Sequence, residues 1–207
     1  MGDQSDEGGE KLTDNDIFGG MTFRVGQRDE AVAFRCPIYE AELGASGVDR
    51  ADDEGTHLVA VDESGVIRAC LRVLASGPRP FESLEYCALD GIGAFPAVVA
   101  EISRFVVDPD FRAIRSGRFV HLGMLKLVFE YSAKAGITDL LTLSLPHLNR
   151  LYELALFRPV GNPAHHKVWG QVQAMHLNLD SARRHARAAP SRMTTLLFDT
   201  RIPSVIV

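Results

Sequence analysis

The sequence predicts a mixed α/β fold, in which helices cover both faces of one central sheet. Two helices are indicated by apolar residues gathered on one side of 31–43 and around most of the circumference of 118–134. Alternating or β-branched residues indicate the strands of the sheet, at 57–61, 66–74, 101–107 and 139–145. Strand and helix then follow one another from 101 onward, which is the order of a layered α/β protein.

Composition indicates one globular domain. The 207 residues are 46% hydrophobic and 24% charged, and two full domains of this length would be a tight fit. No run of 18 apolar residues occurs and the N-terminus lacks an apolar core, so we expect neither a membrane span nor a signal peptide. The three cysteines are far apart without metal-type pairing, which is typical of reduced thiols in a cytoplasmic protein.

The net charge of −5 comes from the N-terminus. Of 27 acidic and 22 basic residues, six acids and one base lie in 1–20, which leaves 21 of each sign in 21–207. The glycine-bearing, acidic segment 1–20 is therefore predicted to be a disordered tail, and 21–207 to be the single domain. A neutral domain gives no electrostatic reason to expect nucleic-acid binding.

The first half of the chain is expected to run strand, helix, loop and hairpin. A short strand at 21–25 precedes the helix at 31–43, which Asp29 caps and in which Pro37 is expected to cause a kink. The acidic loop 44–55 follows, and the turn 62–65 joins the two hairpin strands. The proline- and glycine-bearing segment 77–93 is expected to be irregular.

The second half begins with the strand 101–107, which Asp108-Pro109 ends. A loop with Arg112, Arg115, Gly117 and Arg118 leads into the helix 118–134, and free N–H groups at a helix start beside arginines suit a phosphate or another anion. The elements expected after the strand 139–145 are a helix at 148–157, strand pieces around 168–176, a short basic helix or loop at 181–189 and a strand at 194–198.

The segment Glu-Ile-Ser-Arg-Phe-Val-Val at 101–107 resembles the Glu-x-Ser-Arg-Phe segment of the autoinducer synthases, which make acyl-homoserine lactones, and of the related N-acyl amino acid synthases. Both groups belong to the GNAT-like N-acyltransferase superfamily, so the resemblance implies a mainly antiparallel central sheet. The tryptophan that the autoinducer synthases carry soon after the first matched helix positions is missing, with Ala45 near its place, and this loss and His57 favour the N-acyl amino acid synthases. The matching positions, in chain order, are Arg35, Tyr39, Asp49, Asp52, Asp53, Arg72, Phe81, Glu101, Ser103, Arg104, Phe105 and Thr142, with the aspartates spaced differently from the family's pair.

The resemblance implies an N-acyltransferase that moves a fatty-acyl group from an acyl carrier protein or CoA thioester to the amine of an amino acid or a related acceptor. No permanently bound cofactor is implied. The superfamily loop Arg-x-x-Gly-x-Gly is matched at Gly117 alone, after Arg112 and Arg115, and the arginines favour a carrier protein over free CoA. Two alternatives stay open: an acyl-homoserine lactone synthase that uses S-adenosylmethionine in quorum sensing, and a non-catalytic acyl-binding module.

The residues themselves suggest the chemistry. An amine must lose a proton before it attacks a thioester, and Glu101 on the central strand is the candidate base. Diverging strands expose backbone N–H groups that can bind the carbonyl oxygen. Arg104 lies three residues from Glu101, so a regular strand would point the two to opposite faces and a bulge is needed to bring both to one site. The alternative is that both are structural and pair with Arg35, Arg72 or the acidic loop.

Other candidates also have two interpretations. Arg112, Arg115 and Arg118 hold a phosphopantetheine group or an acidic carrier, or they form a solvated basic loop. The aspartates at 49–53 bind an acceptor amine or form a hydrophilic turn, and Thr142 lines the acyl pocket or is an ordinary strand residue. The histidines have no metal-site spacing, so no metal is expected.

Overall fold

The computed structural model describes residues 18, 20–76, 81–86, 98–112, 119–199 and 205–206. The strands are β1 (Thr22–Gly26), β2 (Thr56–Val61), β3 (Ile67–Ala75), β4 (Val99–Val107), β5 (Asp139–Ser144), β6 (Arg158–Pro159), β7 (Ala164–His166), β8 (Gly170–Asn178) and β9 (Val205–Ile206). The α-helices are α2 (Arg28–Leu43), α3 (Glu82–Tyr86), α4 (Val120–Lys134), α5 (Asn149–Leu154), α6 (Leu179–Ala188) and α7 (Arg192–Phe198). Single 3-10 turns are η1 (Arg50–Asp53), η2 (Pro109–Phe111) and η4 (Pro146–Leu148).

One mixed sheet runs through the molecule in the order β6-β8-β5-β4-β3-β2-β1-β9, with β7 paired to β8 off this path. The β4–β5 and β1–β9 pairs are parallel, and the other neighbouring strands are antiparallel. The hairpin predicted from residues 57–74 is β2–β3. The mainly antiparallel sheet is therefore confirmed.

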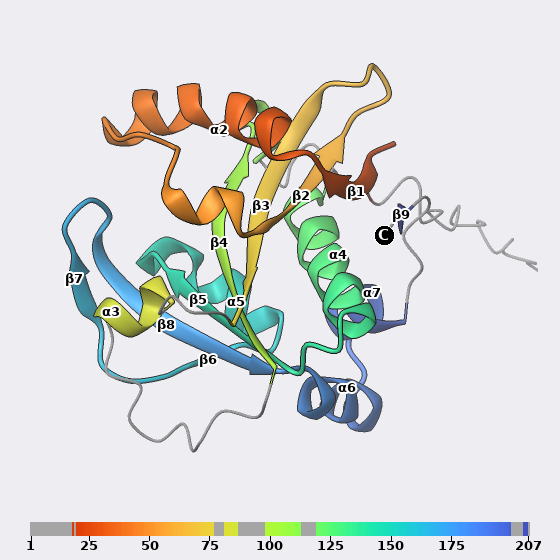
Figure 1. The fold of residues 1–207 in the computed structure, drawn as a ribbon. Coiled ribbons are helices and arrows are strands. Elements are labelled where there is room, and N and C mark those ends of the chain that lie inside the picture. The colour runs from red at the N-terminus through yellow and green to blue at the C-terminus, as the bar shows by residue number, and fades with distance from the viewer. Residues whose placement is uncertain are drawn as a thin grey trace, which may run out of the picture.

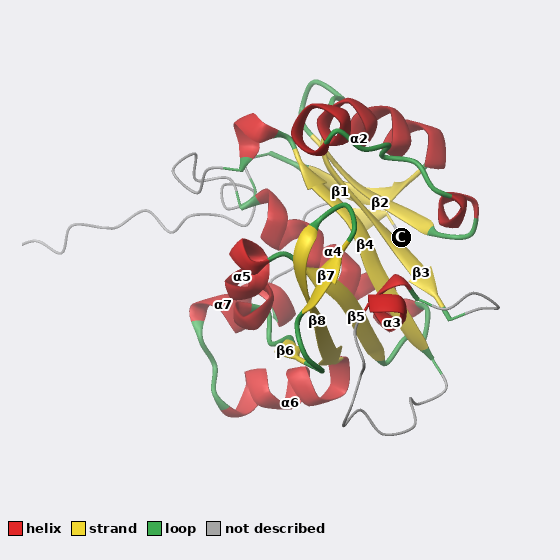
Figure 2. Ribbon diagram, turned by 90° about the vertical axis from the view of Figure 1, so that its left-hand side faces the viewer, coloured by secondary structure: helices red, strands yellow, loops and turns green. Residues whose placement is uncertain are grey.

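Helices lie on both faces of this sheet, as predicted (Figure 1; Figure 2). On one face α2 packs over β2 and β3 and buries Ala31 and Tyr39 against Val59 and Cys70. On the other face α4 crosses β1 to β3, and its apolar side chains form the main core together with side chains of α5 and α7. The two long helices thus cover the β1–β3 side of the sheet, next to the central strands β4 and β5.

The sheet opens between its two central strands. β4 and β5 pair from Val99↔Asp139 to Ile102↔Thr142 and no further, and beyond this point β4 stays with β3 while β5 stays with β8. Backbone groups on this side of β4 after Ile102 thus have no ladder partner from β5. Diverging strands of this kind leave room for a ligand between them and free N–H groups to bind it.

Three expectations about the elements are wrong. The segment 194–198 is part of helix α7: Ser191 caps it, and its apolar face lies against α4, which outweighs the β-branched pair Thr194-Thr195. The predicted helix 148–157 stops at Leu154, and Arg158–Pro159 forms strand β6. Helix α2 is capped by Gln27, whose N–H donates to Glu30, and the predicted cap Asp29 lies in its first turn.

Several expectations concern residues outside the described part. They include Cys87, Arg115, Gly117 and Arg118, and all of the predicted tail 1–20 except Phe18 and Gly20. Phe18 is fully buried, and its ring meets Phe23 of β1 edge-on at a centroid distance of 5.5 Å. No helix in the described ranges is both long and apolar enough to cross a membrane.

Candidate active site

A pocket lies where β4 and β5 part, and residues of α2, α3, β4, β5, α5 and β8 line it. Both predicted catalytic residues, Glu101 and Arg104, are among its lining residues, as are Tyr39, Ser103, Phe105 and Thr142. The structure therefore brings together six of the positions that the sequence singled out, from three separate elements.

A β-bulge in β4 explains how Glu101 and Arg104 reach one site. Between the pairs Arg72↔Ser103 and Cys70↔Val106, β4 has one residue more than β3, and Arg104 adopts a positive φ of 54°. The extra residue reverses the alternation of side chains along the strand. The side chain of Arg104 consequently lies on the same face of β4 as those of Glu101 and Ser103. This is the bulge that the three-residue spacing of Glu101 and Arg104 requires if both are to reach one site.

Glu101 is a buried carboxylate with hydrogen bonds but no ion pair among the described residues. Its side chain is 2% exposed, and its Oε2 accepts hydrogen bonds from the Ser83 N–H at 2.8 Å and the Ser83 hydroxyl at 2.6 Å. Burial raises the pKa of Glu101 above its ordinary value, because the charged form loses its hydration. A carboxylate of raised pKa is a stronger base, which suits it to accept a proton from a substrate.

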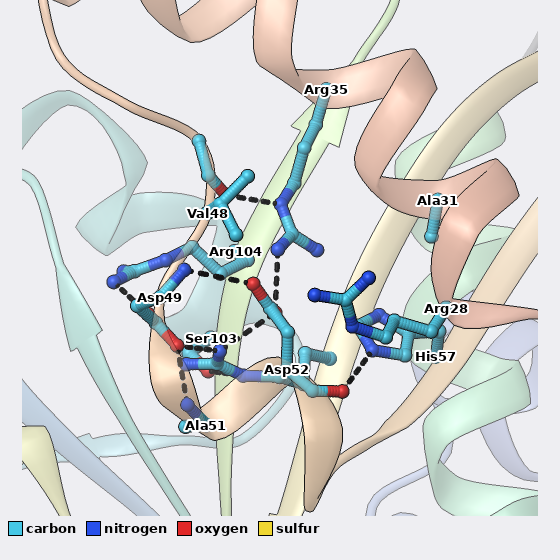
Figure 3. A network of polar contacts seen from close by, with 12 residues as sticks. Arg28, Ala31, Arg35, Val48, Asp49, Ala51, Asp52, His57, Ser103 and Arg104 are labelled. Carbon is cyan, nitrogen blue, oxygen red and sulfur yellow. Dashed lines mark hydrogen bonds and ion pairs between the residues drawn. The ribbon is translucent and has the colours of Figure 1, made fainter.

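The acidic loop is held by buried arginines (Figure 3). Arg35 pairs with Asp52 at 2.5 Å, and both side chains are fully buried. Arg72 pairs with Asp49 at 2.5 Å and with Asp52 at 2.8 Å, and its Nε donates to Ser103 Oγ at 3.1 Å. The predicted residues Arg35, Arg72, Asp49 and Ser103 thus form one network with Asp52, which extends behind the pocket.

Arg104 joins this network to the pocket. Its guanidinium pairs with Asp49, and its Nη1 lies 3.2 Å from Glu82 Oε2. Burial alone would raise the pKa of Asp49, but the hydrogen bond from Arg72 and the charge of Arg104 lower it to about 2. Arg104 is thus a member of two ion pairs, whereas Glu101 takes no part in such a pair within the described ranges.

Asp53 lies apart from the pocket. It pairs with Arg28 at 2.7 Å, and its side chain is 70% exposed. Its neighbour Asp52 is the buried member of the network instead. The two are consecutive residues of η1. Asp52 is the third residue of that turn, and its Oδ2 accepts a hydrogen bond from the N–H of Asp49, which orients it inward.

Aromatic residues close two sides of the pocket. Tyr39 meets Trp169 edge-on at a centroid distance of 5.3 Å, and burial raises the pKa of Tyr39. Trp169, from the turn between β7 and β8, thus brings an indole next to Tyr39, although the tryptophan expected near Ala45 is missing. On the other side Tyr152 and Thr142 both line the pocket, and burial raises the pKa of the Tyr152 hydroxyl to about 12.

Two other predicted positions lie outside the pocket lining. Phe81 is buried beside Leu74, Val99 and Leu141, where it supports the start of α3. Arg112 is half exposed, pairs with Glu42 of α2 at 2.8 Å and donates to the carbonyl of Val107. It does not line the pocket.

Sequence reasoning missed five residues that build the site, all of them from outside the matched strand. The short helix α3 falls in a segment expected to be irregular, and the hairpin β7–β8 had no assigned function. One of these residues could have been found from the sequence, because Trp169 is the single tryptophan of the chain and the matched family has a tryptophan in its site pattern. No cluster of potential metal ligands occurs in the described part of the chain. The missed residues are Glu82, Ser83, Tyr152, His166 and Trp169.

The open central sheet, the bulged strand and the buried carboxylate at their junction define the class of protein: a GNAT-like N-acyltransferase, with an acyl donor and a small-molecule acceptor as substrates. The chain belongs to the autoinducer synthase family, whose model matches residues 44–188, more than half of its length.

Solved structures agree with this assignment in fold. The CoA-dependent acyl-homoserine lactone synthase BjaI is similar with a TM-score of 0.63 and 20% identity, over 83% of this chain and 92% of that one. FeeM, an N-acyl amino acid synthase from uncultured soil microbes, is similar with a TM-score of 0.58 and 18% identity, over 77% of this chain and 91% of that one. LasI, an acyl-homoserine lactone synthase, has a TM-score of 0.60 and 16% identity, over 90% and 97% of the two chains. A comparison with curated protein sequences finds no match.

Proposed function

We propose that the pocket between β4 and β5 transfers a fatty-acyl group from a thioester to the amine of an amino acid or a related acceptor, with Glu101 as the base. One observation carries this proposal: a buried carboxylate of raised pKa lines the place where the central strands part. Apolar and aromatic side chains on the β5 side, Leu143, Leu148 and Tyr152, suit an acyl chain.

The proposed reaction has a simple balance. The acceptor enters as an ammonium, and Glu101 takes one of its protons. The neutral amine attacks the thioester carbonyl carbon, and the new C–N bond leaves a negative charge on the carbonyl oxygen. N–H groups of β4 beyond Ile102, which lack a partner from β5, bind that oxygen. The C–S bond then breaks, the nitrogen gives up its second proton to become a neutral amide, and the departing thiolate takes up that proton, while Glu101 returns the first proton to solvent.

The acceptor has two candidates. An amino acid is the first, because the chain lacks the tryptophan near Ala45 and builds its aromatic wall from Trp169 instead. S-adenosylmethionine is the second, since its amine also fits an ammonium site and lactonisation follows in the acyl-homoserine lactone synthases. A non-catalytic acyl-binding module is less well supported, because that alternative calls for a Glu101 locked in a salt bridge, and the described residues offer it only Ser83.

The donor is proposed to be an acyl carrier protein, with an acyl-CoA as the alternative. Arg112 is exposed beside the strand end and can meet an acidic partner. Rates with the two donors, measured for wild type and Arg112→Glu across a range of salt concentrations, separate them. Salt and the charge reversal should slow transfer from the carrier protein alone. Equal rates with both donors and no salt effect would rule out docking through Arg112.

A cytoplasmic location belongs to the same proposal and is supported by the free thiols of Cys36 and Cys70.

Mass spectrometry of lipid extracts tests the function as a whole. Cells that express the wild-type chain should accumulate N-acyl amino acids or, in the alternative, acyl-homoserine lactones. Cells that express Glu101→Gln at an equal level are the matched control and should not. Extracts in which neither product rises above the control would contradict the proposed function.

A further inference from the structure

A second carboxylate enters the pocket beside Glu101. Glu82, at the start of α3, lines the pocket, and its side chain is 25% exposed. Its Oε2 lies 3.2 Å from Arg104 Nη1, and its Oε1 lies 3.2 Å from His166 Nε2. An ionised carboxylate can accept about four hydrogen bonds, so these two contacts leave it able to bind a further donor from within the pocket.

His166 holds this carboxylate from the β7–β8 hairpin. Its Nδ1 accepts hydrogen bonds from the backbone N–H groups of Val168 at 3.0 Å and Trp169 at 3.1 Å. A nitrogen that accepts carries no proton, so the neutral ring has its hydrogen on Nε2 and donates it to Glu82. The ring is 3% exposed, and burial lowers its pKa, which keeps it neutral near pH 7. His166 thus orients Glu82 without cancelling its charge.

The charges around the pocket favour a cationic ligand. Three guanidinium groups, those of Arg35, Arg72 and Arg104, face the carboxylates of Asp49, Asp52 and Glu82. Glu101 is a fourth carboxylate and has no cation beside it within the described ranges. Once Glu101 ionises to act as a base, this group of residues carries one negative charge in excess. An incoming ammonium restores neutrality, whereas an alcohol does not.

We propose that Glu82 binds the ammonium group of the acceptor and thereby selects amines over alcohols, and that His166 is the positioning residue for Glu82. The inference rests on the proposed acyl transfer and adds a division of labour to it. Glu82 holds the ammonium through a charge-assisted hydrogen bond, and Glu101 removes the proton that must leave. The two carboxylates differ as these tasks require, because one is partly open to the pocket and the other is buried.

Steady-state kinetics of Glu82→Gln test the assignment. The probes are octanoyl-CoA and octanoyl carrier protein as donors, with each of the twenty L-amino acids and S-adenosylmethionine as acceptors. For the best acceptor, Glu82→Gln should raise KM about 10- to 100-fold, the range lost with a hydrogen bond to a charged group, and change kcat less than about threefold. Inhibition by the matching α-hydroxy acid, which lacks the amine, should change little. Glu82→Asp is the charge-conserving control and should retain part of the preference.

Two variants of His166 separate positioning from folding. In His166→Asn the amide oxygen can replace Nδ1 toward the hairpin N–H groups, but nothing reaches Glu82. In His166→Gln the longer amide can still donate to Glu82. KM for the acceptor should therefore rise in His166→Asn, as in Glu82→Gln, and stay closer to wild type in His166→Gln.

The outcomes are distinct. Wild-type transfer to none of the acceptors overturns the proposed function together with this inference. Wild-type transfer with an unchanged KM in Glu82→Gln overturns the inference alone. A loss of kcat at constant KM would place Glu82 in the chemical step and would likewise overturn its assignment as the ammonium site.

Discussion

Asp52 and Asp53 are adjacent residues with opposite environments. Asp52 is fully buried between Arg35 and Arg72, whereas Asp53 reaches out to Arg28 at the surface. A buried arginine left without its carboxylate is costly, because its charge has no water to replace the lost partner. The two aspartates therefore allow the stability contribution of a buried ion pair to be compared with that of an exposed one.

We expect Asp52→Asn to lower the free energy of unfolding by about 3–5 kcal/mol, the range found when one partner of a buried pair is removed. Asp53→Asn is the matched control and should leave the unfolding curve where it is, because its partner is solvated. Urea denaturation followed by circular dichroism measures both. Equal effects of the two substitutions would show that the network does not stabilise the fold.

Glu101 should destabilise the protein as the pH rises. Burial raises its pKa in the folded state above the ordinary value of 4.5, so between that value and the raised one the folded state binds more protons than the unfolded state. The free energy of unfolding then falls as the pH rises through this window. Below pH 4.5 Glu101 is mostly protonated in both states and makes little difference to it. Glu101→Gln removes the dependence, so its Tm relative to wild type should increase from pH 4 to pH 8. A constant difference in Tm over that range would contradict the raised pKa.

At the scale of elements, β4 forms the site through one irregularity. The extra residue at Arg104 turns its side chain to the face of Glu101, and the positive φ of 54° is a conformation that a non-glycine residue adopts at a cost. The ion pairs of Arg104 with Asp49 and Glu82 hold the bulge in place. The ion-pair network therefore offsets the backbone strain at Arg104.

The depth of the pocket between β5 and α5 should set the preferred length of the acyl chain. Thr142 is 2% exposed and lines the pocket together with Tyr152, so a larger side chain there would shorten the space between them. Each buried CH₂ contributes about 0.8 kcal/mol, so Thr142→Phe should shift products to shorter chains and spare the shortest ones. Competition among acyl donors, read by product mass, gives the profile, and Thr142→Val is the control of equal volume. Identical profiles for Thr142→Phe and wild type would remove Thr142 from the acyl pocket.

At the scale of the whole molecule, the elements that were predicted correctly are those whose structure depends on nearby residues. The hairpin, the central strand and the helix after it follow from alternation, turns and apolar faces, and all are present in the structure. Helix α7 was predicted as a strand, because Thr194 and Thr195 favour strands locally, while packing against α4 and the cap at Ser191 decide the outcome.

The site was predictable only where it follows one strand. Glu101, Ser103 and Arg104 are close in sequence and form a recognisable segment, and the need for a bulge followed from their spacing. Glu82 and His166 are 84 residues apart, and no periodicity links them. Their meeting depends on how the β7–β8 hairpin lies beside α3, which is a property of the folded chain (Figure 1).

The central claim is that Glu101 removes the proton from the acceptor amine, and the single-turnover rate of acyl transfer by Glu101→Gln tests it most directly. Wild-type and variant protein at equal concentration, saturated with acceptor, are mixed with an acyl thioester, and the released thiol is followed in time. The variant should fold normally and transfer the acyl group at least about 100-fold more slowly, the contribution of a positioned general base. A variant rate close to that of wild type would show that the proton leaves by another route and would contradict the account.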